Sequence, residues 1–160
     1  MGTAHPLKYK NINEMSSALI ERLPRQYIYH YMPSRLKYLY HKLKAPEYKE
    51  ARFSDFHTEK VGKDALLNLI RESRCILDSP QFGQTGLTIR SIECLGAKRK
   101  LITTNREIRK YDFYNERNVF IYTDEPDLNA EFFSQPYEEI DEAVYRKYSL
   151  SAWLKVMLEA

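Results

Sequence analysis

Residues 75–105 read CILDSPQFGQTGLTIRSIECLGAKRKLITTN, and this stretch decides the fold. A short apolar run at 75–79 is followed by a loop, a helical pattern over 85–97 and a second apolar run at 100–104. Neither run alternates with polar residues, which is typical of strands that are covered on both faces of a parallel sheet. The stretch therefore predicts a strand, a crossover helix and a parallel strand.

The rest of the chain continues the alternation of helix and strand. Further strands are predicted at 26–32, 51–57 and 118–123, and helices at 12–23, 33–44, 64–73, 126–133, 141–148 and 150–158. We expect an α/β fold with a doubly wound, mainly parallel, Rossmann-like sheet flanked by helices, in a single domain over 1–160. Because only residues 6–10 offer an earlier strand, this sheet either lacks its first strand or borrows it from a partner.

Two predicted helices carry an apolar stripe. In 33–44 the stripe consists of Leu36, Leu39, Tyr40 and Leu43. We expect this helix to pack on the sheet with its basic residues in water; an anionic membrane surface is the alternative. The last helix follows Ser149 as N-cap, and we expect it to dock through its apolar face, which contains Leu150, Trp153, Leu154, Met157 and Leu158.

Charge and composition narrow the function classes. The net charge of +3 is too small to argue for nucleic acid, although residues 1–52 hold ten Lys/Arg against four Glu. The two cysteines, Cys75 and Cys94, lie in apolar settings and are expected in the core.

No apolar run approaches the ~20 residues that span a bilayer. We expect a cytoplasmic location, with any membrane contact peripheral and on the inner face.

A ligand site is predicted where the strand at 75–79 meets the next helix. In open parallel sheets, ligands bind outside the carboxyl ends of the strands. A helix beginning at Thr85 and Gly86 would offer free N–H groups and a positive dipole end to a phosphate. Gly86 has no Cβ and allows close approach to the backbone. Neutral hydrogen-bond donors are available from Gln84, Thr85 and Thr88.

The same helix carries a carboxylate. Thr85, Arg90 and Glu93 are spaced to share one helix face. Glu93 can accept hydrogen bonds from the vicinal hydroxyls of a ribose, and Arg90 can pair with Glu93 or with a phosphate; a plain surface ion pair is the alternative. The predicted ligand-binding residues are Gln84, Thr85, Gly86, Leu87, Arg90 and Glu93.

The segment from Thr85-Gly86 through Glu93-Cys94-Leu95-Gly96-Ala97 to residues 100–103 resembles the C-terminal, donor-binding domain of GT-B glycosyltransferases. The amino-acid sequence of residues 84–115 is similar to that of bacterial capsular-polysaccharide and lipopolysaccharide biosynthesis proteins of this type. By this resemblance Glu93 holds the ribose of a nucleotide-diphosphate sugar and Gly86 lies near its diphosphate. Thr85 replaces the family's first glutamate, and Lys98, which replaces a glycine, would add positive charge near the ligand.

The resemblance also implies a partner. A GT-B enzyme has two Rossmann-like domains, so this chain corresponds to the donor-binding half and needs an N-terminal acceptor domain or a partner subunit for transfer. The competing hypothesis is a non-catalytic binding or assembly module that retains the fold.

We expect no cofactor and no metal. Asp55, His57 and Glu59 alternate as strand neighbours would, but three such residues in a polar stretch arise often by chance. The tyrosines of 26–32 could stack nucleic-acid bases, yet core packing is the usual role of aromatic strand residues.

Overall fold

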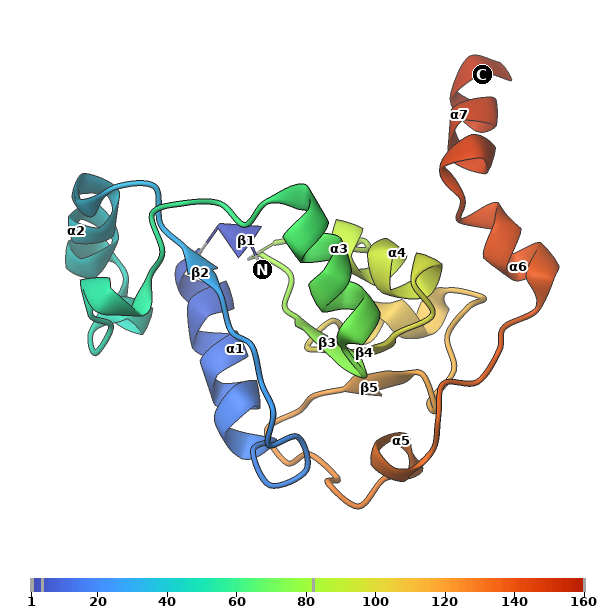
Figure 1. Ribbon diagram of the computed structural model, residues 1–160, viewed down its shortest axis with the longest axis horizontal. Helices are drawn as coiled ribbons and strands as arrows, with labels where there is room; N and C mark the ends of the chain where they lie inside the picture. The colour runs from blue at the N-terminus through green and yellow to red at the C-terminus, as the bar shows by residue number, and fades with distance from the viewer. Residues whose placement is uncertain (1, 4, 82, 160) are drawn as a thin grey trace. The chain divides into compact units, whose positions relative to one another are not determined.

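The computed structural model describes residues 2, 3, 5–81 and 83–159 (Figure 1). The chain divides into two compact units. The first unit comprises Met1–Asn68 with Gln81–Gln84, and the second unit comprises Leu69–Pro80 with Thr85–Ala160.

The first unit is built around aromatic side chains. Its elements are β1 (Gly2–Thr3), α1 (Pro6–Ala18), β2 (His30–Tyr31), α2 (Arg35–Lys44) and the 3-10 turns η1 (Pro46–Tyr48) and η2 (Phe53–Asp55). β1 and β2 pair in parallel. The core contains Met32, Tyr38, Tyr48, Ala51 and Phe56, with Tyr9 and Phe53 packed against it.

Two strand predictions in this unit differ from the structure. Only His30–Tyr31 of the expected 26–32 strand pairs as a strand, and the expected 51–57 strand contains η2 instead, with a single bridge between Tyr31 and His57. The aromatic rings explain the difference, because they pack against one another rather than along a ladder: the Tyr9 ring centroid lies 4.8 Å from that of His30 and 5.1 Å from that of Phe56.

The expected early strand at residues 6–10 is helical. Pro6 begins α1, where its missing N–H and fixed φ suit the first helical position. β1 lies before it and pairs with β2 in a two-stranded sheet of the first unit, separate from the sheet of the second unit.

The second unit contains the parallel sheet that the sequence predicted. The helix α3 (Lys63–Glu72) begins in the first unit and ends in the second. The chain then runs through β3 (Cys75–Asp78), α4 (Ile89–Gly96), β4 (Lys100–Thr103), η3 (Arg106–Lys110), β5 (Val119–Ile121), α5 (Glu131–Ser134), α6 (Glu142–Lys147) and α7 (Leu150–Glu159). The sheet is three-stranded, with the order β3-β4-β5 and every pairing parallel. The α/β class and the parallel sheet are thus confirmed.

Successive side chains of each strand point to opposite faces of the sheet. Leu101 of β4 packs with Cys94 and Leu95 of α4 and with Val119 of β5. On the opposite face, Phe120 of β5 lies with its ring centroid 5.5 Å from that of Phe132 in α5. All four residues of β4 are buried, as expected of a strand that is covered on both faces, although Lys100 and Thr103 at its ends are polar.

Lys100 is a buried cation that attaches α5 to the sheet. Its Nζ donates to the carbonyl oxygens of Phe132 at 2.6 Å and Gln135 at 2.7 Å. Arg74 donates to the carbonyl of Phe133 at 2.6 Å. These carbonyls belong to the C-terminal end of a short helix, which has no intrahelical donors for them. Burial lowers the pKa of Lys100, and the neighbouring Arg74 lowers it further.

The last helix differs from the expectation. Ser149 is its N-cap, accepting from the Ala152 amide at 3.2 Å, as predicted. However, no residue of α7 is buried, and Trp153 is 57% exposed. The apolar face of α7 is therefore not docked on this chain. In the described part of the chain, no helix is both long enough and apolar enough to cross a membrane.

Replacing Trp153 with Ala should change the free energy of unfolding by less than about 1 kcal/mol, because the exposed ring loses little packing. The buried Ile108, in the same unit, is the control; Ile108→Ala should cost about 2–5 kcal/mol. Urea unfolding of both variants measures the two values. A loss for Trp153→Ala as large as that for Ile108→Ala would show that α7 docks in solution.

Candidate functional site

Polar side chains gather at the carboxyl edge of the parallel sheet. β3 ends at Asp78 and β4 at Thr103, two buried residues that are register partners. Ser79 and Asn105, which follow the two strands, are buried as well. Buried polar groups destabilise a fold unless they are hydrogen-bonded, so this edge needs a connected network.

Thr88 joins the start of α4 to the end of β3. Its Oγ1 donates to Asp78 Oδ2 at 2.6 Å and accepts from the Ser91 amide at 3.2 Å. The second bond is an N-cap interaction, and the first is a short hydrogen bond to a carboxylate. One hydroxyl group thus fixes the first turn of the helix against the end of a strand.

Asn105 holds the loop that precedes α4. Its Nδ2 donates to the Gly86 carbonyl at 3.1 Å, while its Oδ1 accepts from the Glu107 amide at 3.1 Å and caps η3. Its own amide donates to Thr103 Oγ1 at 3.1 Å. The turn after β4 and the loop after β3 are therefore tied together at the same edge of the sheet.

The helix starts later than predicted. α4 begins at Ile89 with Thr88 as N-cap, so Thr85 and Gly86 lie in the preceding loop, where both are exposed. The helix starts here because Thr88 donates a hydrogen bond to the Asp78 carboxylate, which holds Thr88 in the N-cap position. A Cβ placed on Gly86 would meet nothing within 4 Å, so the space beside this backbone is open.

The remaining loop candidates divide between the units. Leu87 is half-buried and packs against the core beneath α4. Gln84 belongs to the segment grouped with the first unit, where its Oε1 accepts from the Gln81 amide at 3.4 Å. Thr85 and Gly86 are therefore the predicted loop residues that belong to the second unit and are exposed to solvent at the sheet edge.

Arg90 and Glu93 form an ion pair on α4. Their side chains are 12% and 36% exposed, and Oε2 of Glu93 is shielded from solvent. The buried face of the helix is made by Ser91, Cys94 and Leu95, which leaves Glu93 on the other side. Thr85, Arg90 and Glu93 were expected to share one face of the helix. Only Arg90 and Glu93 do so, because Thr85 lies outside the helix.

Lys98 does not lie at the ligand edge. It follows the C-terminal end of α4, opposite to the end that Thr88 caps, and its φ of 53° is in the left-handed region. This conformation favours glycine at the end of a helix. Lys98 Nζ forms an ion pair with Glu139 Oε2 at 2.6 Å, so its positive charge lies beyond the C-terminal end of the helix and not at the ligand edge.

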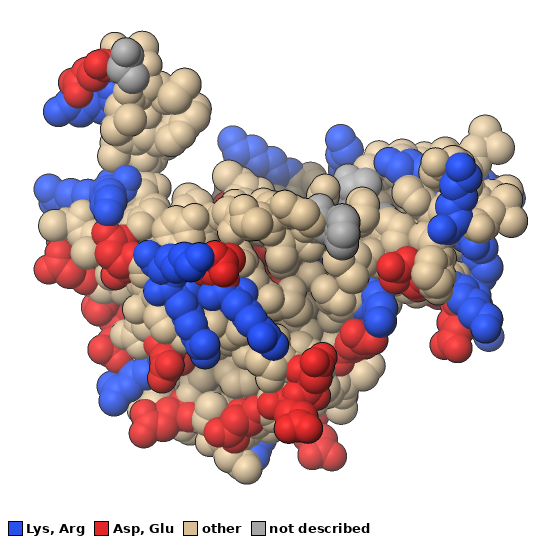
Figure 2. All heavy atoms as spheres, turned by 180° about the vertical axis from the view of Figure 1, so that it is seen from behind, with Lys and Arg blue, Asp and Glu red and all other residues tan. Residues whose placement is uncertain are grey.

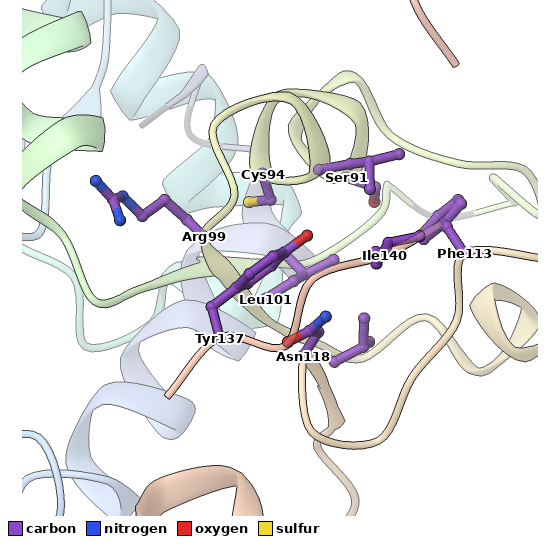
Figure 3. A pocket seen from close by; sticks show the side chains of 10 residues that line it. Ser91, Cys94, Arg99, Leu101, Phe113, Asn118, Tyr137 and Ile140 are labelled. Atoms are coloured by element: carbon purple, nitrogen blue, oxygen red, sulfur yellow. The ribbon is translucent and has the colours of Figure 1, made fainter. Parts of the chain in front are cut away.

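A small cavity beneath α4 is not large enough for a nucleotide. Figure 3 shows Cys94 from α4 and Leu101 from β4 facing Tyr137 and Ile140 from the C-terminal part of the unit. The cavity volume of about 10 Å³ is room for about one water molecule. Cys94 lies in the core, and Cys75 is half-buried. Burial raises the pKa of the Cys94 thiol and raises that of Cys75 to about 11, which disfavours the nucleophilic thiolate form.

Comparisons with protein-family models, curated proteins and solved structures gave no match for this chain. Any functional conclusion therefore depends on the geometry of the site and on the residues that form it.

Sequence reasoning identified Thr88 only as a neutral donor and did not identify Asn105 or Thr103. A signal was present, because the strand at 100–104 is followed at once by Asn105, a residue that favours helix caps and turns. The pairing of Asn105 with Gly86 could not be predicted, since it joins two loops that are 19 residues apart.

Thr88→Ala should lower the free energy of unfolding by about 2–3 kcal/mol, because it removes the helix cap and a hydrogen bond to a buried carboxylate. Thr85→Ala is the matched control, three residues away and exposed, and should change stability by less than about 0.5 kcal/mol. Chemical denaturation of both variants compares them. Equal losses, or a larger loss for Thr85→Ala, would contradict the position of the cap.

Proposed function

We propose that the second unit binds a nucleotide-diphosphate sugar at the carboxyl edge of its parallel sheet. The unit would serve as the donor-binding part of a glycosyltransferase-like protein in bacterial cell-surface polysaccharide biosynthesis. The three-stranded parallel sheet is compatible with the Rossmann-like, doubly wound arrangement of such domains, and we include that finer assignment in the proposal.

One observation carries this proposal. Thr85 and Gly86 are exposed, yet the backbone around them is held by a partly buried hydrogen bond from Asn105 to Gly86 and a buried one from Thr88 to Asp78. A loop that is fixed without being covered is suited to ligand binding, because little conformational entropy remains to be lost. Its place at the carboxyl ends of parallel strands is where open α/β sheets bind ligands.

The chemistry of this loop suits a diphosphate. The N-terminal end of α4 carries the positive end of the helix dipole, which favours an anion in front of the first turn. The open space beside Gly86 allows phosphate oxygens to approach the main chain. In this proposal the amides near Gly86 hold the diphosphate, and the Thr85 hydroxyl donates to it.

Glu93 is assigned to the ribose. A carboxylate has about four lone-pair positions, so its ion pair with Arg90 leaves positions for two sugar hydroxyls. Arg90 orients the carboxylate through this ion pair, and it is the positioning residue in this proposal. The ribose would then lie along the outer face of α4, with the diphosphate towards Gly86.

Transfer of the sugar requires more than this unit. In the proposal the second unit stabilises the departing nucleoside diphosphate electrostatically, and an N-terminal acceptor domain or partner subunit supplies the acceptor. We therefore expect donor binding without turnover when this chain is assayed alone.

Calorimetric titration with UDP, GDP, CDP and ADP tests the binding. At least one should bind, and Glu93→Ala should weaken that affinity by about 1–3 kcal/mol, roughly tenfold or more, because hydrogen bonds to a charged group are lost. Glu139→Ala is the matched control, since it also removes an ion pair, with Lys98 just beyond the opposite end of α4. It should leave the affinity unchanged.

Two results would contradict the proposal in different ways. Absence of binding at ~mM concentrations of every nucleotide would reject the donor site as a whole. Binding that is equal in wild type and Glu93→Ala, with the fold intact, would exclude Glu93 from the site while leaving the loop in place.

A second candidate is a non-catalytic assembly module. The observation that favours it is the exposed apolar face of α7, which is a surface that a partner would cover. Self-association that Trp153→Ala abolishes in sedimentation experiments, together with no nucleotide binding, is the result expected of such a module.

A further inference from the structure

The helix α2 of the first unit exposes its apolar stripe. Leu36 is 79% exposed and Leu43 is 86% exposed, and Leu39 and Tyr40 between them are exposed too. The expectation that this stripe packs on a sheet was wrong. Tyr38 is the buried residue of the helix.

Tyr38 fixes which side of α2 faces outward. Its hydroxyl donates to the Ala51 carbonyl at 2.8 Å, and its ring lies 5.5 Å from that of Phe53 and 5.7 Å from that of Phe56. At about 100° per residue, the stripe of Leu36, Leu39 and Leu43 points away from Tyr38. The core of the first unit thus holds the helix with its leucines turned outward.

Basic residues border this stripe on both sides. In helical projection Arg35 and Lys42 lie along one edge, and Lys37 and Lys44 along the other. No Asp or Glu occurs between residues 35 and 44. Within the described part of the chain, none of these four cations is ion-paired with a carboxylate. However, Lys42 Nζ donates to the Ala51 carbonyl, and the Arg35 guanidinium lies 5.2 Å from the centroid of the Phe53 ring, so both contact the first unit. Lys37 and Lys44, on the other edge, are exposed. Figure 2 shows Lys and Arg side chains gathered over this end of the first unit, at the right edge of the view.

We propose that α2 binds the surface of a bilayer that contains anionic lipids. The leucines enter the boundary between headgroups and acyl chains, and the exposed Lys37 and Lys44 reach the lipid phosphates, while Arg35 and Lys42 add positive charge on the other edge. The long stems of lysine and arginine allow their charges to stay in the headgroup layer while the leucines go deeper. The contact lies in the interface plane and is reversible, as expected of one short helix.

The charge pattern favours lipid over the other possible occupants. A protein interface depletes lysine relative to the rest of the surface, whereas here lysine borders the apolar stripe on both sides. Nucleic acid would attract the cations but would leave Leu36 and Leu43 without an apolar partner. An anionic bilayer provides the apolar layer and the phosphates together. This inference concerns the first unit and does not depend on the nucleotide proposal.

Flotation of the full chain with lipid vesicles tests the proposal. The chain should bind vesicles of phosphatidylcholine with phosphatidylglycerol at least about tenfold better than vesicles of phosphatidylcholine alone, and high salt should weaken the binding. The double variant Leu36→Ser/Leu43→Ser should lose at least about tenfold in affinity. Lys37→Glu/Lys44→Glu, which reverses charge on one edge, should lose the preference for anionic vesicles.

The helix α7 offers a matched control. Leu150→Ser/Leu158→Ser changes two leucines that are 71% and 85% exposed but lack the basic borders, and it should leave vesicle binding unchanged. Circular dichroism of each variant verifies folding. Equal binding to neutral and anionic vesicles, or full binding by the α2 leucine variant, would overturn the proposal. So would loss of binding through the α7 variant alone, since it would assign the contact to that helix.

Discussion

The hydrogen bond from Thr88 to the buried carboxylate of Asp78 is the constraint on which the arrangement of the second unit depends. A carboxylate at the end of a strand in the core destabilises the fold unless it is hydrogen-bonded. The Thr88 hydroxyl supplies a donor and, through the same atom, caps α4. The start of the helix is thereby determined, and the residues between Ser79 and Thr88 must form a loop at the strand ends. Asn105 then fixes the far part of this loop through Gly86.

Part of the second unit could be predicted from the sequence, because its strands are apolar runs without a polar face. The strands predicted at 75–79, 100–104 and 118–123 are all present, and their parallel pairing follows from the helical connections between them. The start of α4 was misplaced by four residues, since Thr85 and Thr88 are equally good caps by residue type. The carboxylate that distinguishes them is ten residues away from Thr88 and is identified only by the fold.

The helices α2 and α7 show where apolar periodicity is insufficient. In α2 and α7 the stripe was correctly located along the sequence, but it faces solvent in both. Periodicity predicts that a helix has an apolar side; it does not predict what covers that side. In α2 the decisive residue is Tyr38, which lies outside the stripe and is held by the aromatic core of the first unit. The candidate site raises a similar problem, because Arg90 and Glu93 are adjacent on the helix as predicted, while Thr85 is not aligned with them.

We propose above all that the loop at Thr85 and Gly86 is a preformed site for a nucleoside diphosphate. A titration of the ¹⁵N-labelled chain with the nucleoside diphosphates, followed through the backbone amide chemical shifts, tests this. The largest shifts should occur at the amides from Thr85 to Arg90, with smaller changes around Glu93 and little change in the first unit. Shifts confined to the basic helix α2, or no shifts at ~mM nucleotide, would contradict this proposal.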